Sequence, residues 1–200
     1  DTPSQHSAHY TVSNPYNQQA LAQYAYTPAS NFDAVLQQLK QGQRQQRQLS
    51  AHQRADILRQ LAQLLEQHSE QLAAMITAET GKTISDARVE MGRAINTALA
   101  SSDEARQITG EVLDSDAYPP TRQRLGIVRW QPIGTVLCIT PFNFPINLAL
   151  HKIGPAFAAG NCILLKPSPA NTASSQLLTE LCHRAGMPEA VIQMRVPAIA

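Results

Sequence analysis

Charged side chains are scarce in this sequence. Asp, Glu, Lys and Arg make up only 16% of its 200 residues, and the formal net charge is +1. Domains that hold nucleic-acid phosphates electrostatically carry a clustered surplus of basic residues, which this composition does not supply. Arg44, Arg47, Arg54 and Arg59 recur in glutamine-rich stretches and are typical of a solvated helix face. We therefore expect no nucleic-acid partner.

Cysteine is also rare. Cys138, Cys162 and Cys182 cannot all pair with one another, and their spacing fits no zinc-binding pattern. The first two lie in apolar runs, and none of the three has the electropositive, accessible surroundings that a reactive thiolate requires. We expect core thiols in a reducing compartment, the cytoplasm, and no metal centre.

Long apolar runs are missing as well. No stretch reaches the roughly 18 uninterrupted apolar residues that cross a bilayer, so we expect no membrane span. The first residues show neither the basic region nor the apolar region of a secretory signal peptide. Hydrophobic residues nevertheless make up 43% of the chain, and a chain of this length can bury about 70% of its extended surface.

The patterning of the chain divides it into four parts. Residues 1–30 are polar with scattered prolines and predict an extended segment, whereas residues 31–116 show a helical period. A strand arm is predicted at 117–132 and contains the linker Tyr118-Pro119-Pro120. Residues 133–200 alternate apolar runs with helical stretches. The predicted fold class is therefore α/β, with N-terminal helices followed by a parallel sheet.

Local signals at the helix ends set the expected helix boundaries. In chain order these are a helix from Phe32 that Gly42 interrupts, a capping box at Ser50 and Gln53, an N-cap at Ser69, a C-terminal Gly81, and a long helix from Ile84 to Ile108 that Gly110 ends. Gly81-Lys82-Thr83 superficially ends a phosphate-binding loop. The glycine that this loop needs five residues earlier is Ile76, so we interpret the segment as a helix end.

The last third of the chain predicts parallel strands joined by helical crossovers. In chain order the expected elements are a strand at 133–140, a helix at 146–159, a strand at 162–165, a helix at 172–185 and a strand that begins at Val191. The first strand is apolar throughout, which is typical of a strand buried on both faces. Ligands of such sheets bind outside the carboxyl ends of the strands, so loops 140–145 and 166–170 form the candidate binding region.

Each of these loops offers polar side chains. Asn143 lies between Pro141-Phe142 and Phe144-Pro145, and the two prolines restrict the backbone around it. An amide held in this way could donate to a developing oxyanion, or it could hydrogen-bond its own turn. Lys166 and Ser168 could meet an anionic or ribose-bearing ligand, or Lys166 could be a solvated lysine at a strand end. The residues alone leave these alternatives open.

Several ordered motifs together resemble the aldehyde dehydrogenase superfamily. Residues 131–145 are similar to its P-x-G … P-[FW]-N-[FY]-P signature, and residues 151–162 are similar to its K-x-x-P-A-L-A-A-G-N. Residues 165–168 resemble its strand-end K-P-S, and residues 78–82 resemble its E-T-G-K helix end. The resemblance covers about residues 30–193.

This resemblance implies a Rossmann-like cofactor domain that lacks G-x-G-x-x-G and that binds NAD or NADP. It implies that Asn143 is catalytic, because the matching asparagine helps to bind the oxyanion of a thiohemiacetal, and that Lys166 contacts the adenosine ribose. The cofactor-binding residues that it implies are Ile139, Thr140, Pro141, Phe142, Asn143, Lys166, Ser168 and Pro169. The strand pair around 118–130 resembles the family's oligomerisation arm, which implies a homo-oligomer.

The activity that the resemblance implies is oxidation of an aldehyde substrate to a carboxylic acid with NAD(P)⁺. In that family a cysteine thiolate attacks the aldehyde, hydride passes to the nicotinamide, and a glutamate-activated water hydrolyses the thioester. Pro169 stands where the family often has a glutamate that holds the ribose hydroxyls. Proline cannot repel a 2′-phosphate, so NADP is expected to be tolerated or preferred.

The chain has about two-fifths of the family's usual length, and none of its three cysteines stands in the family's nucleophile context. The sequence therefore predicts a truncated, cofactor-binding portion that is inactive alone. Two alternatives remain open. One is a non-catalytic remnant that binds a dinucleotide or only a full-length partner, and the other is a helical interaction module in which the α/β half is scaffold.

Overall fold

The computed structural model of the chain describes residues 9–114 and 125–197. The helices are α1 (Phe32–Gln48), α2 (Ala51–Gln67), α3 (Ser69–Thr80), α4 (Ile84–Ala105), α5 (Pro145–Ala158) and α6 (Thr172–Arg184), with short 3₁₀ helices η1 (Ala29–Asn31) and η3 (Pro169–Asn171). The strands are β1 (His9–Ser13), β2 (Ala20–Ala25), β3 (Glu111–Asp114), β4 (Leu125–Val128), β5 (Thr135–Ile139), β6 (Cys162–Lys166) and β7 (Ile192–Met194).

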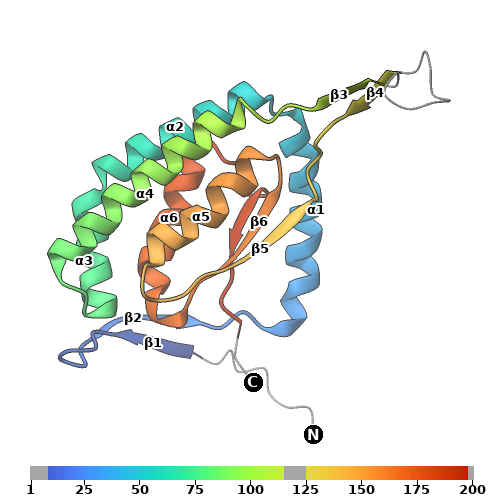
Figure 1. Ribbon diagram of the computed structural model, residues 1–200. Coiled ribbons are helices and arrows are strands. Elements are labelled where there is room, and N and C mark those ends of the chain that lie inside the picture. Colours follow the sequence, from blue (N-terminus) through green and yellow to red (C-terminus); the bar gives the residue numbers. More distant parts are fainter. Residues whose placement is uncertain (1–8, 115–124, 198–200) are drawn as a thin grey trace, which may run out of the picture.

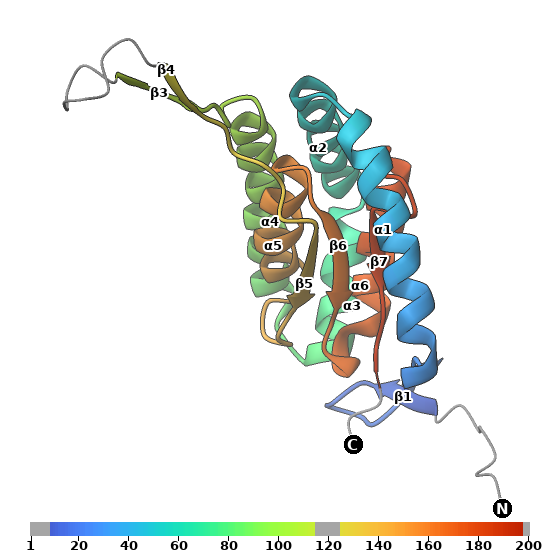
Figure 2. The same ribbon diagram turned by 90° about the vertical axis from the view of Figure 1, so that its right-hand side faces the viewer.

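A parallel sheet of three strands, in the order β5-β6-β7, lies in the middle of the molecule (Figures 1 and 2). Helix α1 packs on one face of this sheet, and α5 and α6 pack on the other. Helices α2, α3 and α4 form a further layer against α5 and α6. The prediction of N-terminal helices followed by a parallel sheet is therefore confirmed. No helix in the described ranges is long and apolar enough to cross a membrane.

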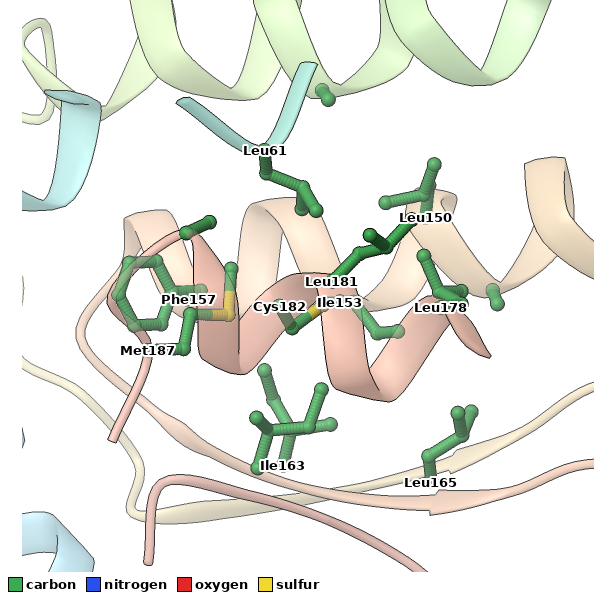
Figure 3. Packing of buried hydrophobic residues seen from close by; sticks show 14 of the residues in the cluster. Leu61, Leu150, Ile153, Phe157, Ile163, Leu165, Leu178, Leu181, Cys182 and Met187 are labelled. Atoms are coloured by element: carbon green, nitrogen blue, oxygen red, sulfur yellow. The ribbon is translucent and has the colours of Figure 1, made fainter. Parts of the chain in front are cut away.

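The hydrophobic core extends from the sheet past α5 and α6 to Leu61 of α2, and one layer of it lies between the sheet and these two helices (Figure 3). Phe157 and Ile153 of α5 meet Leu181 and Cys182 of α6 there, above Ile163 of β6. All five side chains are completely buried. Fully burying a large aliphatic or aromatic side chain contributes about 1.5–3 kcal/mol, so this layer holds the two helices firmly on the sheet.

The strand register brings the carboxyl ends of the strands to one edge of the sheet. Ile139, the last residue of β5, pairs with Lys166, the last residue of β6. Leu165 pairs with Met194 at the end of β7. Both candidate loops therefore start at neighbouring positions, as the alternating pattern predicted.

The prediction that the first strand is buried on both faces is wrong. Cys138 of β5 is buried, but Leu137 and Ile139 on the opposite face are 57% and 55% exposed. Gln43 of α1 reaches only the start of this face, where its amide donates to Thr135 at 3.1 Å. Among the described residues no strand pairs with the far side of β5, so β5 and β7 both form sheet edges.

The capping box at Ser50 and Gln53 is present, and Gly81 ends α3 with φ of 73°, as predicted. Three other predicted boundaries are wrong. Helix α1 continues through Gly42. A Cβ at this position would collide with the carbonyl oxygen of Ala190, so glycine is required there. Ser69 is the first residue of α3 and not its N-cap, and α4 ends at Ala105, before Ile108.

The strand arm projects from the body of the molecule (Figures 1 and 2). It consists of β3 and β4, which pair antiparallel from Glu111 opposite Val128 to Asp114 opposite Leu125. The sequence assigned the stretch that contains β3 to helices. It missed this strand because four residues are too few to show a period. The predicted linker Tyr118-Pro119-Pro120 lies outside the described residues.

Candidate functional site

The two candidate loops are linked at their starts. The backbone N–H of Thr140 donates to the carbonyl oxygen of Lys166 at 3.1 Å, which extends the ladder between β5 and β6 by one bond. Thr140 is buried, whereas Pro141, Phe142 and Asn143 are exposed. The loop after β5 therefore leaves the sheet immediately beyond Thr140 and presents its tip to solvent.

Asn143 lies at this exposed tip. Its side-chain amide makes no hydrogen bond with the residues that the structure describes, so the alternative in which it bonds its own turn is not the arrangement found. Its backbone carbonyl, in contrast, accepts a hydrogen bond from Lys82 Nζ at 2.7 Å. The amide NH₂ group is therefore free to donate to a ligand, while the backbone behind it is held.

Two buried glutamates cap the helices that follow the loops. Pro145 has no N–H, so Ile146 and Asn147 are the first donors of α5 that need partners, and both donate to Glu90 Oε1, at 3.0 and 3.2 Å. Helix α6 is capped at the same two positions by Glu79, whose Oε1 accepts from Ala173 at 2.8 Å and whose Oε2 accepts from Ser174 at 3.2 Å. A carboxylate at a helix N-terminus satisfies unpaired donors and complements the helix dipole.

Lys82 connects one of these caps to the first loop. Its ammonium group lies 2.6 Å from Glu90 Oε2 and 3.9 Å from the centroid of the Phe144 ring. Sequence reasoning missed the roles of Lys82, Glu79 and Glu90. The sequence did contain a signal for Glu79, which lies on the same apolar helix face as Leu72 and Ile76. A carboxylate on that face is expected to be buried and to require hydrogen-bond donors.

The second loop presents Lys166 and Ser168. Lys166 is half-buried, and its side chain makes no hydrogen bond with the described residues. The Ser168 hydroxyl accepts from the N–H of Ala170 at 3.3 Å and so caps η3, the turn that begins with Pro169. The structure places Lys166, Ser168 and Pro169 together on this loop, and Ile139 to Asn143 together on the neighbouring one.

All three thiols are free and buried. Burial raises the pKa of Cys138 and of Cys162 to about 11, and that of Cys182 to about 12. Cys182 faces the core from α6 (Figure 3). The protonated thiol therefore predominates at neutral pH for each of them, and the interpretation as core thiols agrees with this geometry.

Comparison with known proteins supplies a family. A sequence model described as "Aldehyde dehydrogenase family" matches residues 2–198. The chain is 58% identical over 188 residues to a sulfoacetaldehyde dehydrogenase of Neptuniibacter caesariensis, covering 94% of this chain and 41% of that protein. It is 34% identical to a 3-sulfolactaldehyde dehydrogenase of Priestia megaterium (strain ATCC 12872 / QMB1551), covering 92% of this chain and 38% of that protein.

Solved structures agree with these sequence matches. The NADP-dependent glyceraldehyde-3-phosphate dehydrogenase of Bacillus halodurans C-125, complexed with NADP, superimposes with a TM-score of 0.93 at 30% identity. The match covers 97% of this chain and 41% of that one. The chain thus spans about two-fifths of the length of the proteins that it matches, as the sequence predicted.

Proposed function

The chain belongs to the aldehyde dehydrogenase family, and from that premise we propose that it is the cofactor-binding portion of an enzyme that oxidises an aldehyde to a carboxylic acid with NAD(P)⁺. The observation that carries this proposal is the exposed Asn143 amide at the carboxyl end of a parallel strand, in a chain whose family match spans residues 2–198. Binding and orientation of the cofactor and of the aldehyde oxygen are the tasks that these residues can perform.

We infer that the dinucleotide binds across the two neighbouring loops. Because Thr140 N–H is bonded to the Lys166 carbonyl, a ligand that lies along the carboxyl edge contacts both loops at once. Lys166 would supply an ammonium group for the ribose or its phosphate, and the backbone from Thr140 to Asn143 would line the nicotinamide side. The bound cofactor supplies a hydride acceptor.

Asn143 would act on the aldehyde oxygen. As negative charge develops on this oxygen, a preorganised N–H donor stabilises it without further reorganisation. The nucleophilic thiolate must come from outside the motifs of this chain, because Cys138, Cys162 and Cys182 are buried and protonated.

We place the whole protein in a reducing compartment, the cytoplasm, which suits three free thiols.

The named relatives support a substrate class for the whole protein. Two of them are named for aldehydes that carry a sulfonate group, and one of these two is 58% identical to the chain. We expect the whole protein to oxidise sulfoacetaldehyde with a higher kcat/KM than acetaldehyde, because a fixed sulfonate orients the aldehyde carbon. Steady-state kinetics with both aldehydes test this. Equal kcat/KM values, or a preference for acetaldehyde, would contradict the sulfonate proposal, and no oxidation of either would contradict the activity.

Cofactor preference tests the second loop. With Pro169 in place, we expect NADP⁺ to be tolerated or preferred. Pro169→Glu introduces a carboxylate beside the 2′-phosphate and should weaken NADP⁺ binding about tenfold or more, as expected of one like-charge clash. It should not weaken NAD⁺ binding, because a carboxylate at this position can accept from the ribose hydroxyls. Pro169→Ala is the matched control, because it removes the ring without adding charge. Fluorescence titration of the unaltered chain and both variants with NAD⁺ and NADP⁺ measures all six affinities. A preference of the unaltered chain for NAD⁺ of about a hundredfold would overturn the expectation.

The strand arm supports a homo-oligomer. On β3 and β4 the side chains of Val112, Leu125 and Ile127 are 71%, 72% and 64% exposed. Apolar side chains gathered on a projecting hairpin are typical of a protein–protein interface. We expect Ile127→Glu to shift the whole protein to a smaller species in sedimentation velocity, whereas Val89→Glu, an equally exposed apolar site on α4, should not. Unchanged sedimentation of the Ile127→Glu protein would exclude the arm as the interface.

A further inference from the structure

The loop that carries Asn143 has few bonds of its own. Between the N–H of Thr140 and the carbonyl of Phe144, the described residues make one hydrogen bond, from Lys82 Nζ to the Asn143 carbonyl. The Phe142 side chain is 63% exposed, so its packing contributes little to holding the loop in place. The position of a group that must meet a reacting oxygen to within a fraction of an ångström therefore depends on Lys82.

Lys82 is itself held in place. It follows the left-handed Gly81 and precedes Thr83, whose hydroxyl accepts from the N–H of Asp86 at the start of α4. Its ammonium group is fixed by Glu90, whose side chain is completely buried. Charge-assisted hydrogen bonds of this kind are shorter and about twice as strong as neutral ones. The Phe144 ring below the same ammonium adds a cation–π contact.

Glu90 holds the other end of the loop at the same time. One of its oxygens accepts from Ile146 and Asn147, at the start of α5, and the other accepts from Lys82. One buried ion pair thus fixes the backbone at Asn143 and the helix that begins two residues later.

We propose that Lys82 and Glu90 form a loop clamp that positions Asn143 for catalysis. The clamp holds the Asn143 backbone at its carbonyl and leaves the amide NH₂ group free to donate to a ligand. Lys82 and Glu90 are thus positioning residues that act through Asn143. The consequence for turnover rests on the proposed function, whereas the clamp itself is a property of this chain.

Glu79 provides an internal comparison. It is buried and accepts from the second and third residues of α6, as Glu90 does from those of α5, but it uses one oxygen for each bond. It makes no hydrogen bond to loop 140–144. Loss of the Glu79 carboxylate should therefore loosen the start of α6 and leave the Asn143 loop in place.

Hydrogen exchange of the full chain without ligand tests the clamp. Lys82→Met should raise exchange about tenfold or more in peptides covering 143–150, because the loop loses its one charge-assisted bond. The double variant Lys82→Met/Glu90→Gln keeps an acceptor for α5 without an unpaired buried charge, so it stays informative if the single variant unfolds. Lys82→Arg should restore most protection. Glu79→Gln should raise exchange at 172–176 only. Unchanged exchange at 143–150 in both Lys82→Met variants would overturn the proposal.

Kinetics separate positioning from general support. In the whole protein, Lys82→Met should lower kcat about a hundredfold, as misplacement by an ångström does, with the KM for the aldehyde nearly unchanged. Lys82→Arg should recover most of kcat, whereas Glu79→Gln should retain it. An equal loss of kcat in Glu79→Gln and Lys82→Met would show that Lys82 supports the fold in general and does not specifically position Asn143. If the unaltered protein oxidises no aldehyde, the proposed function fails, and the exchange measurement still decides the clamp.

Discussion

Asn143→Ala in the whole protein is expected to lower kcat by ~10²–10³, the typical cost of removing one oxyanion donor. The physical reason is that the Asn143 amide is exposed, makes no hydrogen bond with the described residues, and stands on a backbone that Lys82 holds. Charge develops on the aldehyde oxygen in the transition state, so the donor contributes more there than in the substrate complex. The affinity for NADP⁺ should change much less than kcat.

Stopped-flow and steady-state measurements of hydride transfer check this result. Asn96→Ala, at an exposed asparagine on α4 whose side chain makes no hydrogen bond with the described residues, serves as the matched control. It should keep kcat within about twofold of the unaltered protein, as surface substitutions away from special features do. A turnover rate for Asn143→Ala equal to that of the control would remove Asn143 from the catalytic residues. A parallel loss of cofactor affinity would assign it to binding instead.

The 200-residue chain alone is expected to oxidise no aldehyde. The chemistry requires a thiolate beside the nicotinamide, and proximity of this kind is equivalent to an effective concentration of ~10⁵–10⁸ M. Cys138 and Cys162 lie in β5 and β6, and Cys182 faces the core from α6. Burial raises the pKa of all three thiols, to about 11 or 12, so each is protonated where the enzyme would work.

Purified chain, NADP⁺ and a panel of aldehydes should therefore give no absorbance of reduced nicotinamide above a control without protein. Iodoacetamide at mildly alkaline pH should leave the three thiols of the folded chain unmodified and should modify all three in urea. Turnover that disappears when one cysteine is replaced by serine would show that this thiol reaches the site after all. Because the raised pKa values favour the neutral thiols, stability should fall as pH rises through the unfolded thiol pKa toward 11.

Short-range patterns predicted those parts of the fold that depend on neighbours in the chain. The Ser50 and Gln53 capping box and the Gly81 helix end are contacts within four residues, so the sequence contains all the partners that they need. The alternation of apolar strands and helices likewise implied parallel pairing and placed loops 140–145 and 166–170 at one edge of the sheet.

Contacts between distant segments account for the errors. Gly42 looked like a helix end, but it stays inside α1 because the carbonyl of Ala190 passes against it. The run from Ile133 looked buried on both faces, yet burial of Leu137 and Ile139 depends on what lies over β5 and not on their hydrophobicity. Ala190 is distant from Gly42 in the sequence, and the exposure of Leu137 and Ile139 depends on the packing of other elements around β5. The periodicity of the sequence contains neither kind of information.

The sequence by itself determined the family, the α/β class and the residues Asn143, Lys166 and Ser168 as site candidates, because each rests on local composition and order. Only the tertiary structure decided what holds Asn143. Lys82 and Glu90 lie 61 and 53 positions before it, and they meet the loop because α3 and α4 pack beside α5 and α6. A buried carboxylate must find donors wherever the fold brings them, and here those donors are an ammonium group and the first free N–H groups of α5.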